Sequence, residues 1–125
     1  MQNQNSKPKT ELKYRAYRYS IKMIEFIDAL PNDISTSVIA KQLIRSSTSI
    51  GANIIEAKGA SSKKDFANFF SYALKSANES LYWLGLLRDA KKLNSPSLDY
   101  LLKETKELAN ILGSSILTLK GKKRL

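Results

Sequence analysis

Apolar residues recur along most of this chain at steps of three and four, the spacing that places side chains on one face of an α-helix. Four such stretches are separated by short segments that contain proline, glycine, serine or asparagine. The pattern predicts helices over about residues 11–30, 35–58, 63–93 and 95–119, with no strands. Because the connections are short, we expect neighbouring helices to run antiparallel, as in an all-α, up-and-down four-helix bundle.

Local signals agree with these boundaries. Pro31 is a poor continuation of the first helix, and Ser35 or Thr36 can cap the second. Ser95 followed by Pro96 is a typical helix start. In the first helix, the apolar spacing predicts a buried face made of Tyr17, Ile21, Ile24, Ile27 and Leu30.

Two further rows of residues lie beside the predicted core faces and repeat at helical steps. Such rows predict a surface where helices or subunits meet, and for the polar row the alternative is a face exposed to water. The row in the second helix is small and polar, namely Gln42, Ser46, Ser49, Asn53 and Glu56, with Arg45 beside it. The row in the third helix is Tyr72, Ser76, Glu79, Trp83, Leu86 and Ala90.

The segment 45–57 resembles the signature of a known family, the bacterial four-helix-bundle proteins called 23S ribosomal-RNA intervening-sequence proteins. The family pattern reads Arg-Ser-Ala-Thr-Ser-Ile-x-Ala-Asn-Ile-x-Glu-Gly, and this chain departs from it at Ser47 and Ala57. A second likeness is an aromatic run that leads into a cluster of small residues and a glutamate over residues 66–79. The resemblance implies a helical bundle that often forms a ring of five subunits, and it implies no known reaction.

The length of 125 residues fits one domain. We expect a polar, basic arm over residues 1–10, the bundle over 11–119 and a basic tail over 120–125. Most of the net charge of +10 lies in the two end segments, because residues 1–22 hold six cations and one anion, and 120–125 hold four cations. In an antiparallel bundle the two ends of the chain meet at one end of the molecule, where their charge attracts polyanions.

This charge, interleaved with tyrosines, predicts a site for RNA or single-stranded nucleic acid. Cations hold phosphates, and tyrosine rings stack on unpaired bases. The alternative is that the lysine-rich ends only aid solubility. Tyr17 is assigned to the core, so Tyr14 and Tyr19 are the candidate stacking residues. The predicted contacts are Lys13, Tyr14, Arg15, Arg18, Tyr19, Lys22, Lys120, Lys122, Lys123 and Arg124.

Histidine and cysteine are absent, which excludes disulfides, thiolate or imidazole metal sites and the usual nucleophile and base pairs. Glycine-rich phosphate loops are also absent. The remaining enzymatic option is Glu56 with Glu79, either as a carboxylate site for Mg²⁺ or as a pair of carboxyl groups with shifted pKa values. We prefer a structural role for the polar rows, with the expected partners Asn53, Glu56, Ser76, Asn78 and Arg45. We therefore expect no enzyme activity, no metal and no cofactor.

The longest late uncharged run, residues 108–119, would span only about 18 Å as a helix, less than a bilayer core of about 30 Å. We expect a cytoplasmic homo-oligomer, a pentamer by the family resemblance, that does not use a membrane and binds nucleic acid through its basic end. The alternative function is an interaction scaffold, or an accessory subunit of a nucleic-acid enzyme, without direct nucleic-acid contact.

Overall fold

A computed structural model describes residues 11–121. These residues form four helices and no strand: α2 (Leu12–Asp28), α3 (Ile34–Ala57), α4 (Lys63–Ala90) and α5 (Pro96–Gly121). The all-helical prediction is therefore confirmed, and no helix end differs from its predicted position by more than three residues. No described helix combines the length and apolar composition needed to cross a bilayer.

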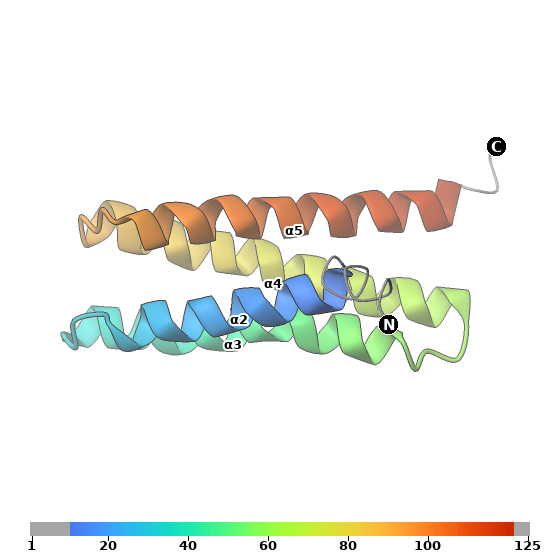
Figure 1. Ribbon diagram of the computed structural model, residues 1–125, viewed down its shortest axis with the longest axis horizontal. Coiled ribbons are helices and arrows are strands. Elements are labelled where there is room, and N and C mark those ends of the chain that lie inside the picture. Colours follow the sequence, from blue (N-terminus) through green and yellow to red (C-terminus); the bar gives the residue numbers. More distant parts are fainter. Residues whose placement is uncertain (1–10, 122–125) are drawn as a thin grey trace, which may run out of the picture.

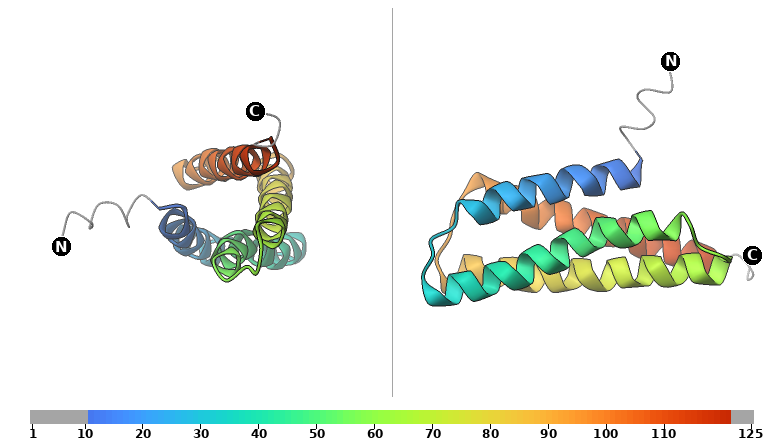
Figure 2. Two further views of the ribbon diagram at one scale, coloured as in Figure 1. Left: turned by 90° about the vertical axis from the view of Figure 1, so that its right-hand side faces the viewer. Right: turned by 90° about the horizontal axis from the view of Figure 1, so that it is seen from below.

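Each helix packs against two others, and the contacts follow the order α2, α3, α4, α5 and back to α2. The view along the bundle in Figure 2 shows the same order around a shared interior. In Figure 1 the colour sequence runs from right to left along α2 and α4 and from left to right along α3 and α5. The start of α2 and the end of α5 consequently lie toward the same end of the molecule, with α2 starting short of that end.

Polar side chains cap the starts of three helices. The Oγ of Ser62 accepts from the backbone N–H of Asp65 at 3.0 Å, and Ser95 caps α5 in the same way. The second helix differs from the prediction, because Asp33 is its cap and accepts from the N–H of Thr36 at 3.0 Å. This hydrogen bond, together with Lys91 at 3.0 Å, holds the pKa of the Asp33 carboxyl below its usual value.

The predicted inward face of the first helix was wrong at three of its five positions, whereas Ile27 and Leu30 pack against the core as predicted. Tyr17 is 66% exposed, and Ile21 and Ile24 are also exposed. The buried residues of α2 are instead Ala16, Tyr19, Met23 and Phe26. This helix has more apolar positions than one face can hold, so spacing alone allowed two choices of buried face.

Close packing against α3 explains which face is buried. A Cβ added at Gly51 of α3 would lie 3.4 Å from the Cβ of Ala16, so two small residues let the helices approach. The large side chains of Tyr19 and Met23 then fill the interior, and neither is exposed at all. The isoleucine row could not provide this close approach to α3.

The other three helices each bury a row of mostly apolar residues. In α3, Leu43, Ile50, Ile54 and Ala57 are buried. The buried residues of the other two helices include Phe70, Ala73, Ala77, Leu84 and Leu87 in α4, and Leu98, Leu108, Leu112 and Ile116 in α5. These residues form one cluster with the buried side chains of α2, so the described chain has a single shared core.

Candidate nucleic-acid interface

Lysines gather at the end of the bundle where α5 finishes. Lys63 and Lys64 in the first turn of α4 and Lys120 in the last turn of α5 line one surface groove. We call it the lysine groove, and its full lining is Lys63, Lys64, Ala67, Asn68, Leu119 and Lys120. All three lysines are exposed. The groove therefore presents three flexible cations from two helices to the solvent.

A neighbouring groove lies where α2 begins. Lys13 of α2 and Lys58, which follows the last residue of α3, both line it. The remaining lining residues are Glu11, Leu12, Ile54, Phe66 and Phe70. Both grooves include residues from the first two turns of α4, so five lysines from all four helical segments lie around one end of the molecule. We call this region, with its two grooves, the lysine-rich end.

The sequence prediction missed three of these lysines. Lys58, Lys63 and Lys64 flank the connection between α3 and α4, in a part of the chain whose charges nearly cancel. Their importance comes from topology, because this connection lies at the same end as the start of α2 and the end of α5. Asp65 reduces the local charge, and one of its oxygens accepts from the N–H of Ser61 at 3.1 Å.

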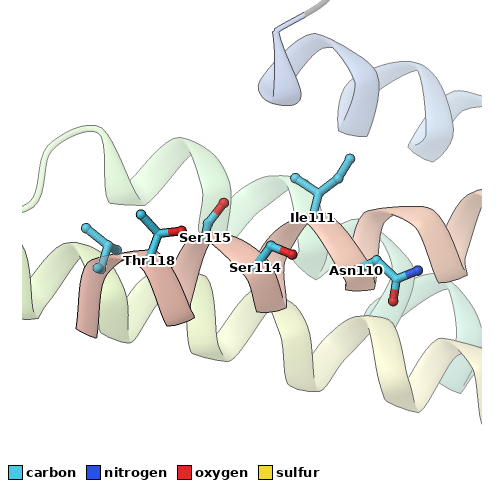
Figure 3. A pocket seen from close by; sticks show the side chains of 6 residues that line it. Asn110, Ile111, Ser114, Ser115 and Thr118 are labelled. Carbon is cyan, nitrogen blue, oxygen red and sulfur yellow. The ribbon is translucent and has the colours of Figure 1, made fainter. Parts of the chain in front are cut away.

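A groove lined by hydroxyl groups continues from the lysine groove along α5. Leu119 lines both grooves. Figure 3 shows the labelled side chains of this second surface following α5, and its lining is Asn110, Ile111, Ser114, Ser115, Thr118 and Leu119. Hydroxyl and amide groups commonly contact the sugar and phosphate oxygens of nucleic acids. A strand bound at the lysine groove would therefore find neutral hydrogen-bonding groups beside it.

Arg15 is partly exposed, but two carboxylates of α5 pair with its guanidinium group. Its Nε lies 2.6 Å from Oε2 of Glu104, and its second guanidinium nitrogen bridges Glu104 and Glu107. The hydrogen bond to Glu104 is the main cause that raises the pKa of Arg15. These ion pairs join α2 to α5. Because two carboxylates already compensate the charge of Arg15, we do not include this residue in the candidate site.

The assignment was wrong for two of the three tyrosines of α2. Tyr19, a candidate for base stacking, is fully buried, and its hydroxyl lies 2.6 Å from Oγ1 of Thr105. Burial raises the pKa of Tyr19. Tyr17, assigned to the core, is exposed. Tyr14 is exposed as predicted, with the Nζ of Lys13 5.1 Å from the centre of its ring.

The remaining predicted cations of α2 do not gather with Lys120. Arg18 and Lys22 are exposed. Lys22 lines a groove with Pro31, Leu93 and Tyr100, where the connections after α2 and α4 lie, at the end opposite to the lysine-rich end. The structure thus separates Lys22 from Lys13 and Lys120. Lys122, Lys123 and Arg124 lie outside the described residues.

The two rows predicted on α3 and α4 face one another. Ser49, Asn53, Tyr72, Ser76 and Glu79 line a common groove between these helices. The Oγ of Ser76 donates to the Oγ of Ser49 at 3.0 Å, which links the rows directly. Ser80 lies outside both predicted rows, yet it is fully buried and its Oγ lies 2.8 Å from that of Ser46.

The other expected pairings of these rows differ in detail. Asn53 donates to the carbonyl of Ser49 in its own helix at 2.9 Å, and Arg45 donates to Gln42, also within α3. In α4, the Nε1 of Trp83 donates to Glu79 at 2.9 Å. Asn53 is therefore not paired with Ser76, and local bonds satisfy most of the row. Glu56 is exposed, and Leu86 is half-buried.

The described residues contain no group of three or more carboxylates that could hold a metal ion. Glu79 is engaged by Trp83, and no described contact joins it to Glu56. No side-chain nitrogen or oxygen that is buried within residues 11–121 lacks a hydrogen-bond partner. The buried polar groups of this region therefore offer no preformed ligand site, and the charged surface remains the candidate site.

Comparisons with known proteins agree with the fold. Residues 9–114 match the family described as 23S rRNA-intervening sequence protein. A crystal structure of a protein of unknown function from the S23 ribosomal protein family of Bacteroides thetaiotaomicron is similar, with a TM-score of 0.78 and 35% sequence identity. The match covers 85% of this chain and 98% of that chain. No curated protein matches the sequence.

Proposed function

Because the chain belongs to the 23S rRNA-intervening sequence protein family, we propose that it is a non-enzymatic, RNA-associated protein that binds phosphates at its lysine-rich end. The observation that carries this proposal is the convergence of Lys63, Lys64 and Lys120 on one groove, with Lys13 and Lys58 nearby. Such a surface attracts a polyanion from any direction and fixes little sequence preference.

The chemistry of the site supports backbone binding rather than base reading. Lysine ammonium groups are point charges that contact phosphates, and the hydroxyl groove on α5 can contact sugars and phosphates. Tyr14 and Tyr17 are exposed aromatic rings on α2, but neither lines the lysine groove. We therefore expect affinity that depends strongly on salt and weakly on sequence. Such binding takes place where the RNA is, in the cytoplasm.

The proposal is tested by replacing the lysines of the groove with glutamine. The variant Lys63→Gln, Lys64→Gln, Lys120→Gln removes three exposed charges from the lysine-rich end. A matched control, Lys41→Gln, Lys103→Gln, Lys106→Gln, removes three exposed charges from other parts of α3 and α5. Binding of a labelled fragment of ribosomal RNA is measured by fluorescence anisotropy at low salt. None of the replaced lysines lies in the core, so both variants should fold.

We expect the groove variant to bind at least about tenfold more weakly than the parent, since each lysine neutralises one phosphate. The control variant should lose only the smaller, long-range part of the attraction. Equal losses in both variants would show that overall charge and not this groove determines binding. If the parent binds no RNA, the proposal fails and the alternative function as a protein scaffold takes its place.

We also propose that the protein is an antiparallel up-and-down bundle that assembles into a homopentameric ring. The course of the chain in Figure 1 supports the antiparallel arrangement. The groove between α3 and α4 is the proposed subunit contact, because exposed Tyr72 lines it and half-buried Trp83 and Leu86 continue the same row farther along α4. Tyr72→Glu should lower the mass measured by light scattering. An unchanged mass would remove this surface from the assembly.

A further inference from the structure

The groove beside the start of α2 has a different lining from the lysine groove. Its deep part is apolar, because Ile54 is 4% exposed and Phe70 7%, with half-buried Leu12 and Phe66 beside them. Its volume is about 280 Å³. Pockets that enclose a whole small ligand usually measure about 300–1,000 Å³, so this groove has room for one small group only. We call it the aromatic groove, and its lining is Glu11, Leu12, Lys13, Ile54, Lys58, Phe66 and Phe70.

Two phenylalanine rings make up much of the apolar lining. Phe66 and Phe70 lie four residues apart on α4, and their ring centres are 4.7 Å apart. Phe70 is nearly buried, so its packing holds the ring of Phe66 in place. Phe66 is only half-buried and lines the groove. A fixed, partly open aromatic ring favours a flat aromatic group, because stacking adds free energy to the burial of apolar area.

Two cations stand beside this apolar surface. Lys58 is exposed and Lys13 is half-buried. Within residues 11–121, neither lysine forms an ion pair with a carboxylate. A flat ring joined to negatively charged groups is the chemistry of a nucleotide, whose base is aromatic and whose phosphates are anionic. An apolar side chain of a partner protein would fill the same space but would make no use of the two lysines.

The aromatic groove adjoins the lysine groove. Lys63 of the lysine groove and Phe66 of the aromatic groove are three residues apart on α4, and so are Ala67 and Phe70. Residues three apart are neighbours on the surface of a helix. A strand whose phosphates lie on the lysine groove can therefore place a neighbouring base beside Phe66.

We propose that the aromatic groove takes one unpaired base of the bound RNA, stacked against Phe66, with the adjoining phosphates on Lys13 and Lys58. This inference rests on the proposed function, because it places a base of the strand whose phosphates are held at the lysine-rich end. Bases within a duplex are already stacked and paired, and extruding one of them is unfavourable. The aromatic groove therefore selects single strands, loops and ends of RNA.

Glu11 gives this groove a preference among bases. Its carboxylate is exposed at the edge of the groove, where it repels phosphates and accepts hydrogen bonds. Cytosine, adenine and guanine carry an exocyclic amino group that can donate to a carboxylate, whereas uracil carries none. We therefore expect cytosine to bind more tightly than uracil, a pyrimidine of the same size.

The first test removes the ring from the protein. Phe66→Leu keeps an apolar side chain in the core, and Phe69→Leu is the matched control, since Phe69 is also half-buried against the core but does not line the groove. Fluorescence anisotropy measures binding of a cytosine strand of about eight nucleotides and of a duplex of the same length. We expect Phe66→Leu to weaken binding of the strand at least about fivefold and to leave binding of the duplex unchanged. Equal effects of the two substitutions on the strand would overturn the proposal.

The second test leaves the protein unchanged and removes the bases from the RNA. An abasic strand of the same length keeps every phosphate, so it measures the electrostatic part of binding alone. The parent should bind the strand with bases at least about fivefold more tightly than the abasic strand, and Phe66→Leu should reduce this ratio. Equal affinities of the parent for the two strands would contradict a base in the aromatic groove, even if Phe66→Leu did not fold.

The role of Glu11 is tested by comparing a cytosine strand with a uracil strand. The side chain of Glu11 makes no capping hydrogen bond, so Glu11→Ala should leave α2 intact. We expect the parent to prefer cytosine by about three- to tenfold, the usual effect of one hydrogen bond, and Glu11→Ala to lose this preference. The ratio of the two affinities cancels the general effect of the lost charge. An unchanged ratio in Glu11→Ala would remove this carboxylate from the site.

Failure of the aromatic groove and failure of RNA binding give different results. The variant with Lys63, Lys64 and Lys120 replaced by glutamine should weaken binding of strand and duplex alike, whereas Phe66→Leu should weaken binding of the strand alone. A parent that binds RNA but does not distinguish the abasic strand would refute the aromatic groove and leave the lysine groove in place. A parent that binds neither strand nor duplex would refute both.

Discussion

The hydroxyl of Tyr19 on α2 lies 2.6 Å from Oγ1 of Thr105 on α5, and neither side chain is exposed to solvent. Oγ1 of Thr105 donates to the carbonyl of Leu101 at 2.5 Å. The hydroxyl of Tyr19 therefore donates to Thr105, and its proton is satisfied inside the core. This contact ties the first described helix to the last, 86 positions away in sequence.

Removing this hydroxyl should have a modest and measurable cost. Tyr19→Phe leaves Thr105 bonded to Leu101, so we expect the free energy of unfolding to fall by about 1 kcal/mol. Thr105→Val removes the hydroxyl that accepts from Tyr19 inside the core and should cost about 1–3 kcal/mol. Urea unfolding measures both, and Tyr17→Phe is the exposed control, expected within about 0.5 kcal/mol of the parent. A double variant whose cost equals the sum of the two would contradict the contact.

The same residue makes stability sensitive to high pH. Because burial raises the pKa of Tyr19, the folded state keeps this proton at a pH where the unfolded chain has lost it. The contribution of protonated Tyr19 to the free energy of unfolding is therefore complete below about pH 10, the usual tyrosine pKa. It decreases as the pH rises above that value. Between about pH 10 and 11 the parent should lose stability faster than Tyr19→Phe, by up to about 1.4 kcal/mol per pH unit. Parallel curves for the two proteins would exclude a buried, titrating Tyr19.

Arg15 should matter for stability and little for RNA. Arg15→Gln leaves Glu104, whose side chain is only 13% exposed, without its cation. We expect the free energy of unfolding to fall by about 1–3 kcal/mol. In the same preparation, RNA affinity should change less than it does for Lys63→Gln. A large loss of RNA affinity with unchanged stability would return Arg15 to the nucleic-acid interface.

The close approach of α2 to α3 at Gly51 can be tested by substitution. Gly51→Val inserts a branched side chain toward Ala16 and should cost about 1–3 kcal/mol by overpacking. At Gly113 of α5 an added Cβ would meet nothing within 4 Å, so Gly113→Ala should stabilise the helix by about 0.5–1 kcal/mol. Thermal unfolding of the two variants should move in opposite directions. Tolerance of valine at Gly51 would show that α2 is not held close to α3.

The sequence determined the helices well because their signals are local. Apolar spacing, Pro31 and the serine caps specify where helices start and end without knowledge of their neighbours. The inward face of α2 depends on packing instead. Ala16 is chosen over Tyr17 because Gly51, on another helix, makes room only for a small side chain.

The candidate site was predictable only in outline for the same reason. Counting charge along the chain identified Lys13 and Lys120 but treated Lys58, Lys63 and Lys64 as part of a balanced middle segment. These three residues join the site only after the connection between α3 and α4 is placed next to the end of α5. Arg15 is not part of the site because Glu104 and Glu107 of α5 pair with it. A count of charges along the sequence cannot show such a contact between helices.

The salt dependence of RNA binding tests the central claim most directly, because it counts the phosphates that the protein neutralises. The logarithm of the binding constant is measured against the logarithm of salt concentration for the parent and for the variant with Lys63, Lys64 and Lys120 replaced by glutamine. We predict a straight line whose slope becomes shallower by about two in the variant, from about 0.7 for each lost single-strand contact. Equal slopes for the two proteins would show that the lysine groove does not hold RNA.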